Sequence, residues 1–186
     1  MTPVRAWVLG LDTATAWRSL ALWHLADDVV WRDAAPLGRA GAARLVPDVA
    51  TFLAAHGVRR DELAGIGVGV GPGSYTGLRS GIAAALGLGL ALQVPVAGSG
   101  TLEAMAFGAL ERSGSGWVLL DARRGRIHAL HAERVGARLR ILRGPVTMPR
   151  SELADEPGDR FEDVPPDAVW HAWNALTSRP PKPRYG

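Results

Sequence analysis

The stretch Gly67-Val-Gly-Val-Gly-Pro-Gly-Ser-Tyr-Thr-Gly-Leu-Arg-Ser-Gly81 decides how this chain folds. The apolar run Ile66–Val70 predicts a short buried strand, because Val and Ile fit a pleated surface. Gly71-Pro72-Gly73 ends this strand, since proline lacks an amide donor and glycine permits a tight turn. A helix is expected over Thr76–Leu92, and either Ser74 or Thr76 can supply the N-cap oxygen. Such a strand–turn–helix unit either cradles an anion or lets two backbones approach closely.

Two common phosphate-binding motifs do not fit this turn. A Walker-type loop needs a lysine followed by Ser or Thr, and the single lysine of the chain is Lys182. A dinucleotide fingerprint spaces its glycines differently and needs an acidic residue further on, which is absent here. A structural role and a ligand-binding role for the glycines therefore both stay open at this point.

Composition narrows the class of protein. The chain has 186 residues, of which 47% are hydrophobic and 21% charged, and it has no cysteine. These values suit a soluble protein of one large domain or two small lobes, without disulfides or thiolate chemistry. The N-terminus lacks a secretory pattern, so the cytoplasm is the expected compartment. The uncharged run Ser80–Leu102 is broken by Gln93 and Pro95, and no membrane span is expected.

An internal repeat indicates a duplicated fold. Three strands, at 7–11, 17–25 and 29–32, are followed by a helix at 40–56, a strand and a helix. Trp7-Val-Leu-Gly-Leu-Asp12 is similar to Trp117-Val-Leu-Leu-Asp121, and a polar turn and an apolar strand follow each. The repeat predicts a two-lobe α/β fold of the actin, hexokinase and Hsp70 class, which is ribonuclease H-like, although two unrelated hairpins would give the same pattern.

The expected organisation has three parts. Residues 1–105 form the N-terminal lobe with the order β-β-β-α-β-α, and residues 106–178 form a small C-terminal lobe. That lobe contains an acidic loop at 151–167 and a closing helix that is capped by Asp167. The proline-rich tail 179–186 is expected to be extended.

Several segments resemble the TsaB (YeaZ) family, whose members are subunits of the bacterial machinery that makes threonylcarbamoyladenosine in tRNA. The long match is Val70–Gly81, continued by Leu86–Val96 and Ser99–Ala104. The shorter matches are Leu9–Thr13, Arg44–Pro47 and Asp121–Arg123. These segments occur in the same order as in the family, and together they span roughly residues 7–130. Members of the family usually have a longer second lobe, so the resemblance implies a shortened second lobe here.

The resemblance also implies a function. It implies a non-catalytic scaffold or activator that pairs with a TsaD-type catalytic paralogue, with a TsaE-type ATPase joining them, and that forms a homodimer when alone. ATP and metal would be held by the partner subunits, with no cofactor on this chain, and tRNA would contact it indirectly or weakly. The resemblance places the partner interface on two helices of the first lobe, at Arg44, Leu45, Pro47, Gly77, Leu78, Arg79, Gly81, Ile82 and Ala85.

The second of these helices carries a ridge of small residues. Gly77, Gly81, Ala85 and Gly89 recur every four residues, which permits another element to approach closely. That element is either the chain's own sheet or a partner helix, and the resemblance favours the partner.

Two carboxylates are candidates for chemistry. In active members of this fold class, a carboxylate at the end of a strand holds a metal–nucleotide complex. The turns after Asp12 and Asp121 lack a phosphate cradle, so only a degenerate nucleotide cleft is expected, formed by Asp12, Thr13, Gly71, Gly73, Ser74 and Asp121. The alternative is a nucleotide-dependent enzyme of the actin/hexokinase class that uses the two aspartates. The five histidines predict no metal site, and neither a Ser-His-Asp arrangement nor a peptidase site is expected.

Charge is unevenly distributed in the second half. Residues 123–150 contain eight arginines and one acidic residue, whereas residues 151–167 contain seven acidic residues. The basic segment either contacts tRNA phosphates or is neutralised by the acidic loop.

Overall fold

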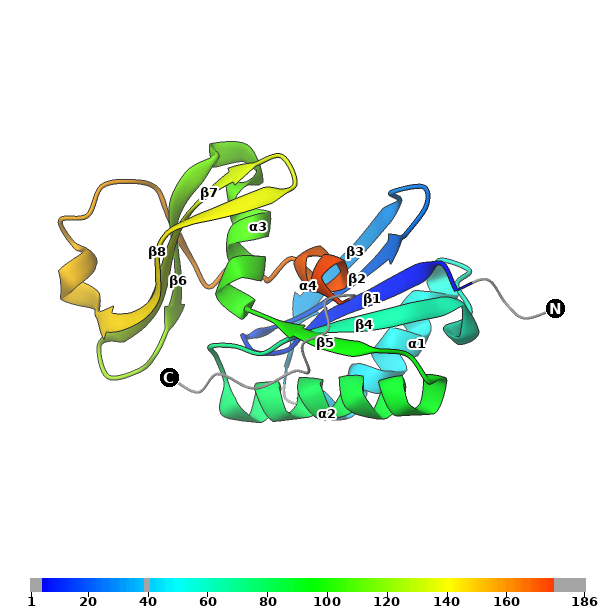
Figure 1. The fold of residues 1–186 in the computed structure, drawn as a ribbon. Helices are drawn as coiled ribbons and strands as arrows, with labels where there is room; N and C mark the ends of the chain where they lie inside the picture. Colours follow the sequence, from blue (N-terminus) through cyan, green and yellow to red (C-terminus); the bar gives the residue numbers. More distant parts are fainter. Residues whose placement is uncertain (1–4, 39–40, 176–186) are drawn as a thin grey trace.

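The computed structural model describes residues 5–38 and 41–175 and has two lobes (Figure 1). The sheet of the first lobe has five strands in the order β3-β2-β1-β4-β5. These strands are β1 (Trp7–Asp12), β2 (Trp17–His24), β3 (Val30–Pro36), β4 (Leu63–Gly69) and β5 (Val96–Ser99). Strands β1, β2 and β3 are antiparallel, while β4 and β5 run parallel to β1.

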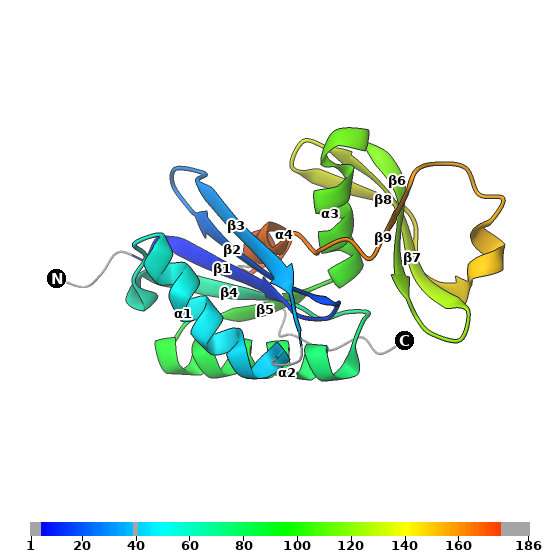
Figure 2. The same cartoon turned by 180° about the vertical axis from the view of Figure 1, so that it is seen from behind.

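Helices cover both faces of this sheet. Helix α1 (Leu45–Ala55), preceded by the 3-10 turn Gly41–Arg44, and helix α2 (Tyr75–Leu92) lie on one face, as Figure 2 shows from behind. The core between them contains Leu9, Phe52, Ile66 and Ile82, among other buried residues. The short helix α4 (Ala168–Asn174) lies on the opposite face, against β1, β2 and β4.

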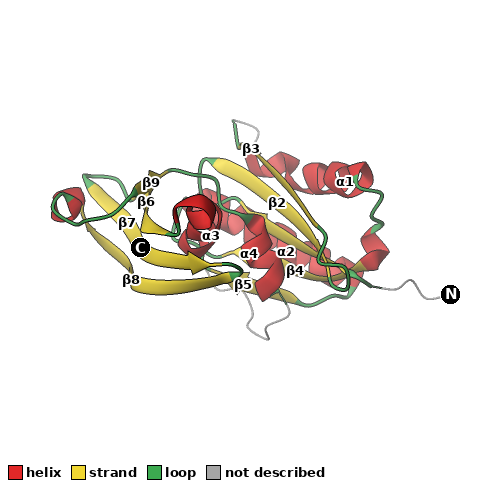
Figure 3. Ribbon diagram, turned by 90° about the horizontal axis from the view of Figure 1, so that it is seen from above, coloured by secondary structure: helices red, strands yellow, loops and turns green. Residues whose placement is uncertain are grey.

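The second lobe contains a four-stranded sheet in the order β8-β7-β6-β9. Its strands are β6 (Ser115–Asp121), β7 (Arg126–Val135), β8 (Arg138–Pro149) and β9 (Arg160–Glu162). Helix α3 (Thr101–Ser113) packs on one face, where Leu102 and Met105 meet Val118 and Leu130. Figure 3 shows the two sheets side by side, with α3 and α4 between them.

The lobes exchange helices. Helix α3 follows β5 of the first sheet but packs on β6 and β7 of the second, and α4 follows β9 but packs on the first sheet. A domain boundary at residue 105 therefore falls inside α3, and part of the expected C-terminal lobe lies on the first sheet. The predicted tail 179–186 lies outside the described residues.

The expected two-lobe α/β organisation is confirmed, with three differences. Helix α3 was not expected from its pattern, and the segment 151–167, predicted to be a loop, contains the 3-10 turn Arg150–Leu153 and strand β9. Helix α2 begins at Tyr75, one residue before its expected start. Among the described helices, α2 is long and apolar enough to cross a membrane by length and composition. Six of its residues are buried in the chain's own core.

Candidate functional site

The carboxylate of Asp12, at the end of β1, is the centre of a buried hydrogen-bond network. Its Oδ2 accepts a bond from the Thr101 hydroxyl at 2.9 Å and lies 2.9 Å from Nε2 of His171. Its Oδ1 accepts a 2.7 Å bond from the amide of Ala14. The side chain has no exposed surface. Both oxygens of Asp12 are therefore occupied by partners from the same chain.

The network continues on both sides of Asp12. On helix α4, Nδ1 of His171 lies 2.7 Å from the hydroxyl oxygen of Ser99, and His171 is fully buried. On the other side, the Thr101 hydroxyl accepts a 3.1 Å bond from the amide of Gly71. The network thus joins β1, β5, α3, α4 and the glycine turn.

The sequence analysis missed His171 and with it this arrangement. Contrary to expectation, a serine, a histidine and an aspartate do form a hydrogen-bonded chain here, although His171 is 159 residues from Asp12 and 72 from Ser99. No local motif connects positions so far apart. Because neither His171 nor Asp12 reaches the surface, this geometry favours a structural role over nucleophilic catalysis.

Glycines in the two central strands let α4 reach Asp12. A Cβ atom on Gly10 would lie 1.9 Å from the carbonyl oxygen of Ala168, and one on Gly67 would lie 1.9 Å from that of His171. A Cβ atom on Gly69 would lie 2.0 Å from Oδ2 of Asp12. Any side chain at these positions would displace the helix or the carboxylate.

The glycine turn after β4 serves close backbone packing. A Cβ atom on Gly73 would lie 2.2 Å from the carbonyl oxygen of Ala14, and the amide of Ser74 donates to the same oxygen at 2.6 Å. The hydroxyl of Ser74 accepts a bond from the amide of Gly77, which confirms Ser74 as the N-cap of α2. Of the two roles left open by the sequence, the structure supports the close approach of two backbones.

The residues of the expected nucleotide cleft only partly come together. Asp12, Thr13, Gly71, Gly73 and Ser74 lie together, and the Thr13 hydroxyl donates to the carbonyl of Gly77 at 2.8 Å. Their polar groups are taken up by bonds to neighbouring residues, Ala14, Gly77 and Thr101 among them, and the carboxylate of Asp12 has no exposed surface.

Asp121 lies apart, on the second sheet. It is exposed and accepts a 3.0 Å bond from the amide of Arg123. In the described ranges, no hydrogen bond or ion pair joins it to Asp12. It lies near Asp163, whose pKa is raised by burial first and then by the charge of Glu162. Because Asp12 is buried and Asp121 is exposed, the two carboxylates do not share one open surface.

The ridge of small residues on α2 faces its own sheet. A Cβ atom on Gly77 would lie 2.0 Å from the Thr13 carbonyl, and one on Gly81 would lie 2.5 Å from the Thr13 hydroxyl. Six predicted interface residues are accordingly buried within the chain: Leu45, Gly77, Leu78, Gly81, Ile82 and Ala85. For these six, the placement on an outward surface is corrected, because the ridge permits close helix–sheet packing. Arg44, Pro47 and Arg79 are exposed.

The outward face of α1 and α2 carries apolar side chains instead. Leu90 is 83% exposed, Tyr75 57%, and Leu86 and Val46 47% each. Arg79 lies beside them and donates a 2.9 Å bond to the Tyr75 hydroxyl. These four apolar residues, with Arg44, Pro47 and Arg79, are called the outer helix face below. It is an apolar surface that the described residues of the chain leave uncovered.

Acidic residues neutralise part of the basic segment. Arg143 pairs with Glu156, Arg150 with Glu162, and Arg140 with Glu133. Arg150 holds the pKa of Glu162 below its ordinary value. The structure therefore favours the second alternative, in which the acidic segment folds back onto the arginines.

The histidines do not assemble into a metal centre. Within residues 5–38 and 41–175, no group of three or more His, Asp or Glu side chains could hold a metal ion. His128 lies 2.8 Å from the Thr147 hydroxyl through Nδ1, and its burial lowers its pKa.

Comparisons with known proteins agree with this fold. The family model described as "TsaD: tRNA N6-adenosine threonylcarbamoyltransferase" matches residues 37–159. The chain is 36% identical over 123 residues to the "tRNA threonylcarbamoyladenosine biosynthesis protein TsaB" of Escherichia coli, covering 65% of this chain and 52% of that protein. It is 37% identical over 122 residues to an uncharacterized protein of Mycobacterium tuberculosis, covering 65% of this chain and 56% of that protein.

A solved structure, "YeaZ from Pseudomonas aeruginosa", superposes with a TM-score of 0.73 at 27% identity, covering 97% of this chain and 83% of that one. The chain spans about half the length of the curated relatives that it matches. The family model covers well over half of the chain's 186 residues. The chain therefore belongs to the TsaD family, and within it to the TsaB (YeaZ) proteins.

Proposed function

We propose that this chain is a non-catalytic subunit for the formation of threonylcarbamoyladenosine in tRNA, and that it supports a TsaD-type catalytic partner. The name of the E. coli relative supports the pathway. The description of the matching family model supports the chemistry of the partner. The cytoplasm, where tRNA is modified, is the corresponding compartment.

The burial of Asp12 is the observation that carries the non-catalytic role. A carboxylate that holds a metal–nucleotide complex needs a free oxygen facing an open cleft. Both oxygens of Asp12 are bonded within the chain, and α4 covers them. ATP and metal would then belong to the partner subunits, the ATP to a TsaE-type ATPase.

The outer helix face is the surface that we assign to pairing. Four exposed apolar side chains gather on two neighbouring helices, and burying them would provide the hydrophobic core of an interface. The same face would form a homodimer when the partner is absent. Because Arg140, Arg143 and Arg150 are paired with acidic side chains, the second lobe would contact tRNA weakly or indirectly.

The test is light scattering on a size-exclusion column, with the chain alone and mixed with a TsaD-type paralogue. A homodimer that gives way to a one-to-one heterodimer supports the proposal. Modification of tRNA by the paralogue and the ATPase should require this chain. If the chain does not bind the paralogue, the proposal is contradicted.

The alternative function, a nucleotide-dependent enzyme that uses Asp12 and Asp121, makes the opposite prediction. It requires α4 to leave the sheet before a nucleotide can reach Asp12. Calorimetry with magnesium–ATP separates the two functions. We expect the isolated chain not to bind magnesium–ATP. Tight binding that Asp12→Asn abolishes would contradict our proposal and support the nucleotide-dependent enzyme.

A further inference from the structure

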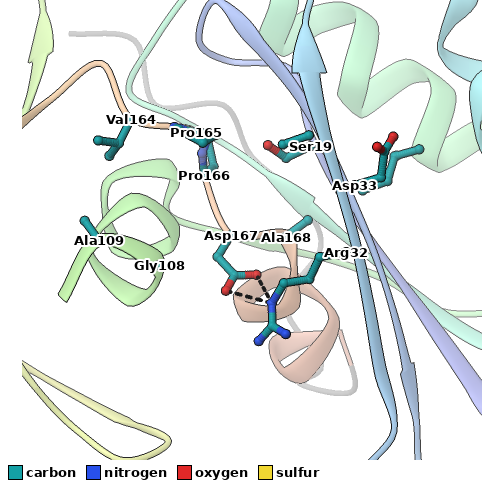
Figure 4. Close-up of a pocket in the computed structure, with 12 residues that line it drawn as sticks. Ser19, Arg32, Asp33, Gly108, Ala109, Val164, Pro165, Pro166, Asp167 and Ala168 are labelled. Atoms are coloured by element: carbon teal, nitrogen blue, oxygen red, sulfur yellow. Dashed lines mark hydrogen bonds and ion pairs between the residues drawn. The ribbon is translucent and has the colours of Figure 1, made fainter. Parts of the chain in front are cut away.

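A cavity lies between the two lobes, beside the start of α4. Its volume is about 370 Å³, within the range of small-molecule sites. Strands β2 and β3 form one wall, and α3 and the segment 164–168 form the other. Figure 4 shows these two walls facing each other. Both lobes therefore contribute to the cavity.

Most of the cavity wall is apolar and stiff. Ala34 comes from the strands, and Val164, Pro165 and Pro166 come from the segment that leads into α4. Proline has little conformational freedom to lose when a ligand binds. A ligand of this cavity would need an apolar body.

The charged groups of the cavity are Arg32 and Asp33 on β3, and Asp167 before α4. Arg32 donates through Nε to both oxygens of Asp167, at 3.2 and 3.1 Å, as Figure 4 shows. Asp167 also caps α4 by accepting a bond from the amide of Val169, and Asp33 pairs with Arg18 at 2.6 Å. Both carboxylates are therefore neutralised within the chain.

The polar groups at the cavity that lack a hydrogen-bond partner within residues 5–38 and 41–175 are donors. The guanidinium of Arg32 is about half exposed, and in the described part of the chain its two Nη groups have no hydrogen-bond partner. The hydroxyl of Ser19, on the strand wall, is buried and also lacks a partner among the described residues. A buried hydroxyl without a partner is costly, but this one has almost no accessible surface, so the donors that a ligand can reach are the Nη groups of Arg32.

We propose that this inter-lobe cavity binds a small carboxylate with an apolar body, whose carboxylate is held by Arg32. An apolar body matches the walls, and a carboxylate matches the planar fork of the guanidinium. The site involves neither Asp12 nor the outer helix face. Whether the cavity binds such a ligand is therefore independent of whether the chain acts as a scaffold.

The test uses 3-phenylpropionate as the probe and the neutral 3-phenylpropionamide as its match in size. Each is titrated into the full chain labelled with nitrogen-15, and amide shifts are mapped by NMR. A molecule of about eleven non-hydrogen atoms is expected to bind with a dissociation constant on the order of 1 mM. The saturable shifts should centre on Gly108, Ala109 and Ala168, which line the cavity.

Two variants and a control complete the experiment. Arg32→Gln removes the charge, and we expect it to weaken binding of the carboxylate about tenfold. Ala109→Phe fills the cavity from α3 and should abolish binding with Arg32 intact. Arg112→Gln, an exposed arginine of the same helix outside the cavity, should leave binding unchanged.

Tighter binding of 3-phenylpropionate than of the amide, lost in both variants, would support the site. No saturable shift up to about 10 mM, equal affinity for the amide, or full binding by Arg32→Gln would overturn it. If Ala109→Phe does not fold, Arg32→Gln and the amide still decide.

Discussion

The carboxylate of Asp12 stabilises this chain as a buried hydrogen-bond acceptor rather than serving as a ligand for a metal or a nucleotide. Its three hydrogen bonds compensate for the removal of a carboxylate from water, and His171 provides one of them. His171→Ala would remove that partner and leave the carboxylate buried. We expect the free energy of unfolding to fall by about 3 kcal/mol.

Urea denaturation measures this loss. The matched control is Asp27→Ala, because the carboxylate of Asp27 is exposed where it faces His24, and its removal should cost less than about 1 kcal/mol. Equal losses in the two variants would show that the network contributes nothing beyond an ordinary contact.

His128 makes stability depend on pH. Burial lowers its pKa, so the unfolded chain binds the proton more tightly than the folded chain does. The stability that neutral His128 contributes is present above its unfolded pKa of about 6.5 and is lost as the pH falls toward the lower folded pKa. His128→Gln cannot titrate, so its free energy of unfolding should fall less between about pH 7.5 and pH 5.5. The prediction fails if urea denaturation gives the same change for both proteins.

At the scale of elements, helix α2 offers a paired test of close packing. A Cβ atom on Gly81 would meet the Thr13 hydroxyl at 2.5 Å, whereas one on Gly87 would meet nothing within 4 Å. Gly81→Ala should therefore destabilise the chain by about 1–3 kcal/mol through overpacking. Gly87→Ala should stabilise it by about 0.5–1 kcal/mol, because alanine is the better helix former. Thermal unfolding of both variants gives the two signs, and the same sign in both would contradict the packing.

The elements also show what the sequence could predict. Helix α2 and strands β1, β2 and β4 follow from local periodicity and turn residues, and each lies close to its expected place. Helix α3 has no clear apolar stripe, because it is buried on most sides between the two lobes. The outward orientation of the glycine ridge was wrong because a row of small residues shows that something packs closely, not what does so. His171 and the inter-lobe cavity depend on contacts between distant segments, which periodicity does not report.

For the whole molecule, the exchange of helices makes each lobe depend on the other. Helix α4 brings His171 to Asp12 of the first lobe, and α3 carries the residues that pack on the second sheet. Both helices are thereby committed to the interior of the chain. Among the described helices, α1 and α2 are left to present an apolar face outward, so association should depend on them.

The double variant Leu86→Glu and Leu90→Glu tests that dependence. Both side chains are exposed, at 47% and 83%, so the charges should leave the fold of the monomer intact. In an interface the same charges would be buried without partners, which should weaken self-association and pairing with a TsaD-type protein by at least a hundredfold. The matched control is Ile141→Glu with Leu142→Glu, since both residues are 45% exposed but lie on β8 of the second lobe. Light scattering should find the first variant monomeric and the control unchanged. If the β8 variant dissociates instead, the edge of the second sheet, and not the outer helix face, is where this chain meets its partner.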